Sequence, residues 1–287
     1  MPRCAFLTLA ERGDFVIDDA LAIEPLAARG WQVDEVHWQT PDPAWADYDL
    51  VVIRSTWDYF DAPRAFLARL REIEAVTQLA NPLSLVEWNL DKRYLLELQA
   101  RGASIVPSTV LESCTVDALE MARADLGGEI VVKPAIGANG EDTFRIGNPS
   151  EAKRATRALE GRACLAQPFR PAILSEGEYS LFWLGDAVSH AIRKVPQGGE
   201  FRSQEERGAE IRSVPVTREL AEAGRRALHA VAPTPLYARA DFVRNPDGVL
   251  EVMELELIEP SLYLRTDPAA PERLAEAIVR WFASIEG

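Results

Sequence analysis

Hydrophobic positions along the first 82 residues alternate between two spacings. Short apolar runs of strand length are followed by segments in which apolar residues recur every three or four positions, as on one face of a helix. This alternation of strands and helices predicts a doubly wound α/β unit with a parallel sheet. The predicted strands are residues 5–10, 31–38, 50–54 and 78–81, and the predicted helices are residues 17–29 and 61–75.

The loops at the carboxyl ends of these strands are the first candidates for a binding site, because ligands of such sheets bind there. They comprise residues 11–18 and residues 55–59, and the second loop has the sequence Ser-Thr-Trp-Asp-Tyr. Trp57 and Tyr59 fit packing in the core and contact with a substrate equally well. The sequence leaves these two interpretations open.

The remaining chain has two patterns that meet at about residue 168. Helices and strands alternate before this point, whereas hairpins after it predict an antiparallel sheet. The polar segment 196–212 predicts a mobile loop. The predicted helices are residues 91–101, 116–124, 150–159, 218–231 and 271–285, and the predicted strands are residues 130–134, 143–146, 164–167, 236–243, 249–257 and two within 178–194.

Composition excludes several classes of function. No apolar run approaches the roughly 20 residues of a membrane span. A net charge of -14 argues against nucleic acids and anionic membranes as partners, because the overall field repels them. Three widely spaced cysteines among 287 residues favour the reducing cytoplasm. The oligomeric state stays open at this stage, a homodimer included.

The strand at residues 249–257 carries an unusual acidic face. Glu254 and Glu256 are two residues apart and therefore point the same way. If the turn at 245–248 closes without a bulge, Arg239 faces Glu254 and Asp241 lies diagonal to it. Three carboxylates on a half-buried face repel one another, and Mg²⁺ with its preference for oxygen ligands relieves this. The alternative is a solvated edge neutralised by Arg239, which the apolar neighbours disfavour.

A second candidate feature follows the strand at 130–134. Lys133 ends this apolar strand, and the next loop contains Gly137 and Gly140, which let backbone N–H groups approach a phosphate. The loop matches neither the Walker nor the dinucleotide pattern, so a plain hairpin loop is the alternative. Lys92, at the start of a predicted helix, is a second cation for the same phosphates.

The order of these features is similar to that of the ATP-grasp carboxylate–amine ligases. The resemblance covers about residues 80–260. It implies an N-terminal α/β domain at residues 1–82, a small central α/β lid lobe at 83–168 and a C-terminal lobe with an antiparallel sheet at 169–287. The features that carry it are Lys92, Val-Val-Lys133-Pro with its glycine-containing loop, Gln167-Pro168-Phe169, Glu178, Arg239-x-Asp241 and Glu254-x-Glu256.

The resemblance also implies cofactors and roles. ATP and two Mg²⁺ ions would bind between the lobes, with Arg239 steadying the transferring phosphoryl group. Asp241, Glu254 and Glu256 would ligate the metal ions, although the family usually has Asn at the last position. The residues that would contact ATP are Lys92 and Lys133 at the phosphates, Gly137 and Gly140 above them, Gln167, Pro168, Phe169 and Met253 at adenine, and Glu178 at ribose.

Such a ligase activates a carboxylate as an acyl-phosphate, which an amine then attacks. Lys194 and Arg202 would close over the substrate with the segment 197–212, for which a flexible surface loop is the alternative. Ser-Thr-Trp-Asp-Tyr and the run from Glu254 to Tyr263 are similar to the cycloserine synthetase branch, the O-ureidoserine cyclo-ligases. There one amino-acid-like molecule supplies both acid and amine and forms a ring.

The position of the first loops suggests where this small substrate binds. We expect Arg54 to hold a carboxylate, with Ser55 beside it, and Asp14, Asp18, Asp19 or Asp58 to hold an ammonium group. Three alternatives remain at this point. They are a linear ligase that joins two amino acids, a ligase that adds amino acids to a protein, and a non-catalytic nucleotide-binding module.

Overall fold

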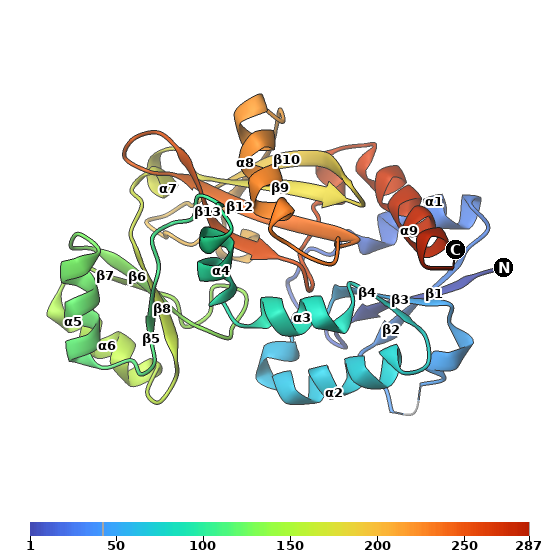
Figure 1. The fold of residues 1–287 in the computed structure, drawn as a ribbon, viewed down its shortest axis with the longest axis horizontal. Coiled ribbons are helices and arrows are strands. Elements are labelled where there is room, and N and C mark those ends of the chain that lie inside the picture. Colours follow the sequence, from blue (N-terminus) through green and yellow to red (C-terminus); the bar gives the residue numbers. More distant parts are fainter. Residues whose placement is uncertain (42, 287) are drawn as a thin grey trace.

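Three sheets, each covered by helices, make up the computed structural model, which describes residues 1–41 and 43–286 (Figure 1). Within those residues no helix combines the length and the apolar character needed to cross a membrane. The N-terminal sheet is parallel, with the strand order β2-β1-β3-β4. Its strands are β1 (Arg3–Thr8), β2 (Gln32–His37), β3 (Leu50–Ser55) and β4 (Gln78–Ala80).

Helices cover both faces of this sheet, as predicted for a doubly wound unit. Successive residues of a strand point to opposite faces, so Phe6 packs among residues of α1 and α9, whereas Leu7 packs among residues of α2 and α3. The C-terminal helix thus completes the N-terminal core. These helices are α1 (Ile23–Ala28), α2 (Pro63–Glu74), α3 (Leu83–Leu90) and α9 (Ala270–Glu286).

The central lobe is a small antiparallel sheet with the order β5-β8-β6-β7. Two helices, α5 and α6, cover one face through a core of small and aliphatic side chains. Strand β5 and helix α3 were not predicted. The elements of this lobe are α4 (Tyr94–Ala100), β5 (Thr109–Leu111), α5 (Val116–Asp125), β6 (Ile130–Pro134), β7 (Phe144–Ile146), α6 (Pro149–Ala158) and β8 (Cys164–Pro168).

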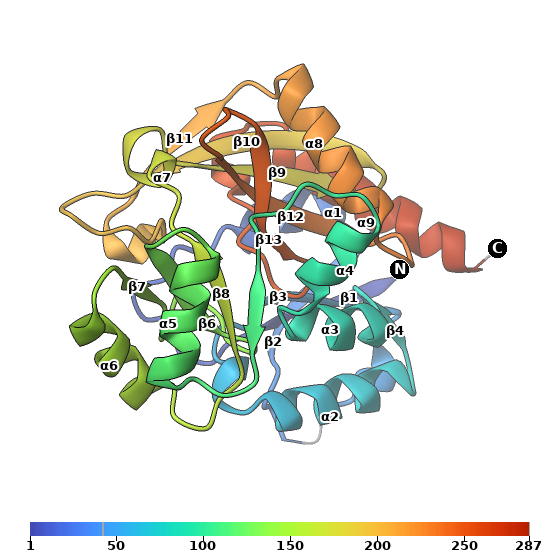
Figure 2. The same ribbon diagram turned by 60° about the vertical axis from the view of Figure 1, so that its left-hand side comes forward.

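The C-terminal sheet is antiparallel and has the order β11-β10-β9-β12-β13 (Figure 2). Helix α8 packs on one face, and the other face shares a core with the N-terminal sheet through α9. The mobile loop predicted over residues 196–212 extends too far, because its last residues belong to strand β11, which pairs with β10. The elements are α7 (Ala172–Ser175), β9 (Glu178–Leu184), β10 (Ala187–Val195), β11 (Glu210–Val214), α8 (Arg218–His229), β12 (Tyr237–Arg244) and β13 (Leu250–Glu256).

The register predicted for the last hairpin was wrong by two residues at its acidic end. The turn takes five residues instead of four, since Arg244 pairs with Leu250, and a bulge at Met253 adds one more. Asp241 therefore lies directly opposite Glu254. A bulge places two successive side chains on one face of a strand. Before the bulge the even-numbered residue Val252 points into the apolar core, and after it the even-numbered residues Glu254 and Glu256 point to the opposite face, into the pocket.

Candidate active site

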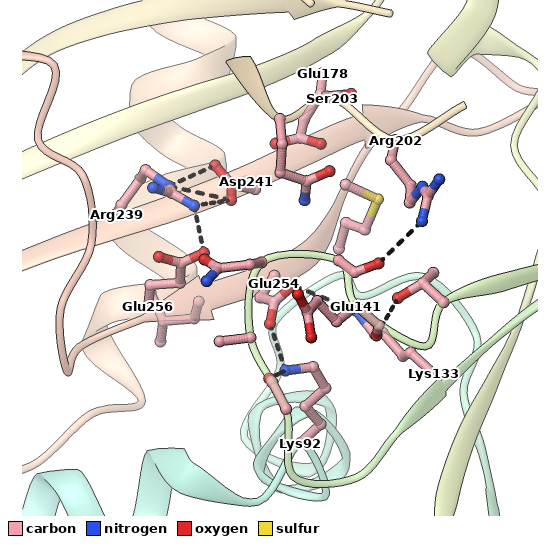
Figure 3. Close-up of a pocket in the computed structure, with 18 of the residues that line it drawn as sticks. Lys92, Lys133, Glu141, Glu178, Arg202, Ser203, Arg239, Asp241, Glu254 and Glu256 are labelled. Atoms are coloured by element: carbon pink, nitrogen blue, oxygen red, sulfur yellow. Dashed lines mark hydrogen bonds and ion pairs between the residues drawn. The ribbon is translucent and has the colours of Figure 1, made fainter. Parts of the chain in front are cut away.

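One pocket collects side chains from the central and C-terminal sheets and from loops, including those of the N-terminal part (Figure 3). One end is apolar and includes Phe169 of the β8–α7 connection and Met253 at the bulge. Charged residues line the middle. The other end is walled by aromatic side chains of the N-terminal loops, namely Phe15, Trp57 and Tyr59.

Two lysines converge on Glu254 in the middle of the pocket. Lys92 Nζ lies 2.8 Å from Glu254 Oε1, and Lys133 Nζ lies 3.5 Å from Oε2. Although burial opposes it, the charges of Lys133 and Lys92 hold the pKa of the Glu254 carboxyl well below its usual value. Burial and the neighbouring Lys92 lower the pKa of Lys133. Both lysines are largely buried, so they can neutralise an anion without competition from water.

Arg239 and Lys194 form the matching cationic pair on the far side of the acids. The Arg239 guanidinium contacts Asp241 at 3.1 Å and also pairs with Glu256. Lys194 lies 3.5 Å from Asp241 and pairs with Glu178. Burial favours the neutral acid, but Arg239 and Lys194 lower the pKa of Asp241 below its usual value. Four cations thus surround the three predicted metal ligands.

The donor set fits Mg²⁺, although the carboxylates are paired with cations in this structure. Among the described residues, no group of three or more His, Cys, Asp or Glu side chains lies close enough to hold a metal ion as placed. Burial together with Asp241 and Glu254 raises the pKa of Glu256 to about 7, even though Arg239 opposes the shift. A divalent cation would relieve this crowding of negative charge, and all the donors are oxygen atoms.

The glycine-containing loop lies over the lysines. Lys92 Nζ donates a hydrogen bond of 2.7 Å to the main-chain oxygen of Gly137. A Cβ atom at Gly137 would come within 2.8 Å of the Pro134 ring, so the close approach requires glycine here. Arg202 Nη1 donates to the main-chain oxygen of Gly140 at 3.4 Å, and Asn139 donates to that of Trp57 at 3.3 Å. The loop therefore contacts both other parts of the molecule.

None of the residues expected to bind substrate, Asp18 and Asp19 included, lines this pocket. Arg54 is fully buried, where it pairs with Asp19 at 2.9 Å and donates to the main-chain oxygen of Pro260 at 2.9 Å. Ser55 is also buried, without a hydrogen-bond partner for its hydroxyl. Asp58 accepts a 2.6 Å hydrogen bond from the Trp38 indole, and Asp14 is exposed.

The expectation for Arg54 is corrected, because a buried and fully engaged guanidinium has no free face for a carboxylate. Sequence reasoning also missed two residues that do line the pocket, Glu259 and Tyr263. The signal was present as a third acid in Glu254-Leu-Glu-Leu-Ile-Glu259, which follows the end of the strand. Trp57 and Tyr59, for which packing and substrate contact were equally good interpretations, line the pocket as well.

The pH dependence of stability provides a test of this environment. Burial and the neighbouring Glu256 raise the pKa of Glu259 from 4.5 to about 8. Between these values the folded state keeps a proton that the unfolded state has released, so stability falls as pH rises. We expect urea unfolding to show a decrease of at most about 1.4 kcal/mol per pH unit from pH 6.5 to 8. Glu259→Gln should flatten this slope, and an unchanged slope would contradict the assignment.

Comparisons with known proteins agree with this geometry. Residues 4–81 match the family model of the N-terminal domain of D-cycloserine synthetase DcsG, and residues 95–234 match that of the ATP-grasp domain of prokaryotic glutathione synthetase. Asp241, Glu254 and Glu256 lie beyond residue 234, where the second match ends. Their assignment as metal ligands therefore depends on the geometry of the pocket and not on this match.

Individual relatives span nearly the whole chain. The cycloserine biosynthesis protein DcsG of Streptomyces lavendulae is 31% identical over 89% of this chain and 91% of its own length. The crystal structure of D-cycloserine synthetase DcsG superposes with a TM-score of 0.85 and 28% identity, covering 98% of this chain and 99% of that chain.

A more distant structure adds evidence for the fold. The ATP-grasp ligase PsnB, in a complex with a precursor variant, Mg and ADP, has a TM-score of 0.66 at 20% identity and covers 97% of this chain and 98% of that one. The chain therefore belongs to the ATP-grasp carbon–nitrogen ligases, enzymes that use ATP and Mg²⁺, and within them it resembles D-cycloserine synthetase.

Proposed function

We propose that this enzyme uses ATP to phosphorylate the carboxylate of a small amino-acid-like substrate and closes a ring within the same molecule. The arrangement of the pocket carries this proposal. Its lining combines an apolar group around Phe169 and Met253, a charged group and an aromatic group, which suit adenine, phosphates and substrate respectively.

The nucleotide would lie along the first two of these regions. Gln167, Pro168, Phe169 and Met253 would surround adenine, and Glu178 would accept hydrogen bonds from the ribose. Lys92 and Lys133 would hold the phosphates beneath Gly137 and Gly140. Their present partner, Glu254, shows that the two ammonium groups already face one shared anion.

Asp241, Glu254 and Glu256 would hold two Mg²⁺ ions, which neutralise phosphate charge and align the transferring group when bound. In the first step a substrate carboxylate oxygen attacks the γ-phosphorus, the bond to the β-phosphate oxygen breaks and ADP leaves. Arg239 is buried and held between two carboxylates, so it would stabilise the charge on the transferring phosphoryl group with little reorganisation.

In the second step the amine nitrogen attacks the carbonyl carbon, the bond to phosphate breaks and the nitrogen loses a proton. Water must be excluded while the acyl-phosphate exists. Arg202 joins the 197–212 segment to the glycine-containing loop through its hydrogen bond to Gly140, which suits a closing role. Lys194, from the adjoining strand, would help to neutralise the phosphate that forms.

The aromatic end of the pocket favours cyclisation over the joining of two molecules. Its walls come from the N-terminal loops, and residues 4–81 are the segment that matches the D-cycloserine synthetase model. The matched glutathione synthetase segment, 95–234, starts after these loops. The part of the chain that surrounds the substrate therefore supports a cyclo-ligase.

The test is substrate-dependent phosphate release with ATP and Mg²⁺, using both enantiomers of O-ureidoserine, free amino acids and short peptides. We expect release with one enantiomer and a product, identified by mass spectrometry, that contains a single substrate skeleton. A product with two skeletons would favour a linear ligase, and release only with a peptide would favour a protein-modifying ligase. ATP binding without release across the whole panel would contradict a ligase and favour a nucleotide-binding module.

A further inference from the structure

Glu259 is a buried acid of the pocket that has no cationic partner. Its side chain lines the pocket and the residue is only 8% exposed. Four other acids of the pocket, Glu178, Asp241, Glu254 and Glu256, each belong to an ion pair, and Glu141 and Glu206, which have no ion pair within the described part of the chain, are exposed. No ion pair of the described residues includes the buried Glu259. Burial without a cation keeps Glu259 protonated at neutral pH, and a ligand that brings a cation would let the side chain lose this proton and form an ion pair.

The backbone around Glu259 is fixed by an unusual row of contacts. Five successive carbonyl groups, from Ile258 to Leu262, each accept a hydrogen bond from a side chain, and we call this segment the carbonyl row. The donors come from β3, the loop after it, β10 and β12. They are Tyr237 to Ile258 at 2.9 Å, Trp57 to Glu259 at 2.8 Å, Arg54 to Pro260 at 2.9 Å, Arg239 to Ser261 at 3.3 Å and His190 to Leu262 at 2.9 Å.

Such a row holds the Glu259 main chain in one place, because moving it would break several buried hydrogen bonds together. The same contacts explain the burial of Arg54 and the position of Trp57. A carboxylate on a fixed backbone is suited to orienting a ligand, since little conformational freedom is lost on binding.

The aromatic walls beside Glu259 are also suited to a cation. Phe15 and Trp57 meet edge to face with their ring centroids 5.0 Å apart, and Tyr59 lines the same end of the pocket. Aromatic faces attract ammonium groups through their negative π-systems, more strongly where water is excluded. Carboxylate and rings together form a site for a small organic cation.

We propose that Glu259 binds the α-ammonium group of the substrate and so restricts the enzyme to α-amino acids. This inference depends on the proposed function, because the carboxylate to be phosphorylated lies on the same small molecule. Tyr59 is a hydrogen-bond partner of Glu259 but carries no charge, and Lys92, whose charge lowers the pKa of Glu259, is paired with Glu254. Glu259 is therefore free to pair with a cation of the ligand. The substrate would then extend from Glu259 toward Arg239 and the phosphates.

The test compares two compounds that differ in one group, O-ureidoserine and its desamino analogue 3-(ureidooxy)propanoate. Calorimetry in the presence of MgADP measures the binding of each compound to the wild-type enzyme and to Glu259→Gln. We expect the wild-type enzyme to bind the better enantiomer of O-ureidoserine at least about tenfold more tightly than the analogue. Glu259→Gln should weaken binding of O-ureidoserine about 10- to 100-fold and leave the analogue almost unchanged, so that the preference is lost.

Two control variants separate charge from structure. Glu259→Asp keeps the charge and should retain part of the preference. Glu160→Gln removes one charge from an exposed position just after α6, outside the pocket lining, and should leave the preference as it is. MgADP affinity is measured for every variant, because a merely structural role for Glu259 would weaken both compounds and the nucleotide alike.

The inference is overturned if Glu259→Gln keeps the preference, or if the wild-type enzyme binds both compounds equally or binds neither. The wild-type comparison decides the matter even if Glu259→Gln does not fold. Loss of the preference in a protein that releases no phosphate would support the ammonium site and contradict the ligase. Phosphate release by an enzyme whose preference survives Glu259→Gln would support the ligase and contradict the ammonium site.

Discussion

Glu254→Gln is expected to lower kcat/KM for substrate-dependent phosphate release by at least about 100-fold. Its carboxylate carries the negative charge that balances both Lys92 and Lys133 and is one of the three proposed ligands of the metal ions. The amide removes that charge without changing the shape of the side chain. Initial rates at saturating ATP over a series of Mg²⁺ concentrations provide the measurement, and the Mg²⁺ requirement should rise.

Asp241→Asn should have an effect of similar size, because Asp241 lies directly opposite Glu254 and faces Arg239 and Lys194. The matched control is Glu120→Gln, which breaks a pair with Arg123 on α5, away from the pocket, and should keep activity within about twofold. Circular dichroism and thermal unfolding confirm that each variant is folded. Full activity in both pocket variants at low Mg²⁺ would refute the metal assignment.

Arg54→Met is expected to reduce the free energy of unfolding by about 3–5 kcal/mol. The guanidinium is 1% exposed and pairs with Asp19, which is 4% exposed. It also lies 4.9 Å from the centre of the Tyr237 ring. Replacement by an apolar side chain leaves the Asp19 carboxylate buried without a cation and frees the carbonyl of Pro260. Urea unfolding monitored by tryptophan fluorescence gives the difference.

Two further variants show whether the buried charge is the cause. Arg54→Met combined with Asp19→Leu removes both partners and should recover part of the lost stability. Arg12→Met breaks an exposed pair with Glu35 and should change stability by no more than about 1 kcal/mol. If Arg54→Met lowered substrate affinity and left stability unchanged, Arg54 would be a substrate ligand after all.

Long periodic segments of the fold were predictable from the sequence. Residues 130–134 and the C-terminal helix have clear spacing and strong end signals, and both elements were found within about a residue of the predicted bounds. Helix α3 was missed because apolar residues surround it, so its spacing resembles no single face. The three-residue strand β5 carries too little pattern to be recognised, since only its pairing with β8 defines it.

The charged part of the site could be predicted from the sequence, whereas the part proposed to bind substrate could not. Local spacing marks the lysines beside predicted elements and the acids on one strand face, and Lys92, Lys133, Asp241 and Glu254 do line one pocket. The substrate end depends on contacts between residues about 200 positions apart, such as Trp57 with Glu259, which no local pattern encodes. The register of the acidic hairpin was missed for a related reason, because the bulge at Met253 leaves no turn residue as a marker.

The carbonyl row has a consequence for the engineering of this family. Its hydrogen-bond donors Arg54 and Trp57 belong to the first 82 residues, whereas the carbonyl groups they bind lie beyond residue 257. Main-chain carbonyl groups are present whatever the side chains, so a chimaera that exchanges only residues 1–82 keeps these bonds only where the incoming domain supplies donors at the positions of Arg54 and Trp57. To transfer substrate preference between family members, residues 258–263 should therefore be exchanged together with the first domain.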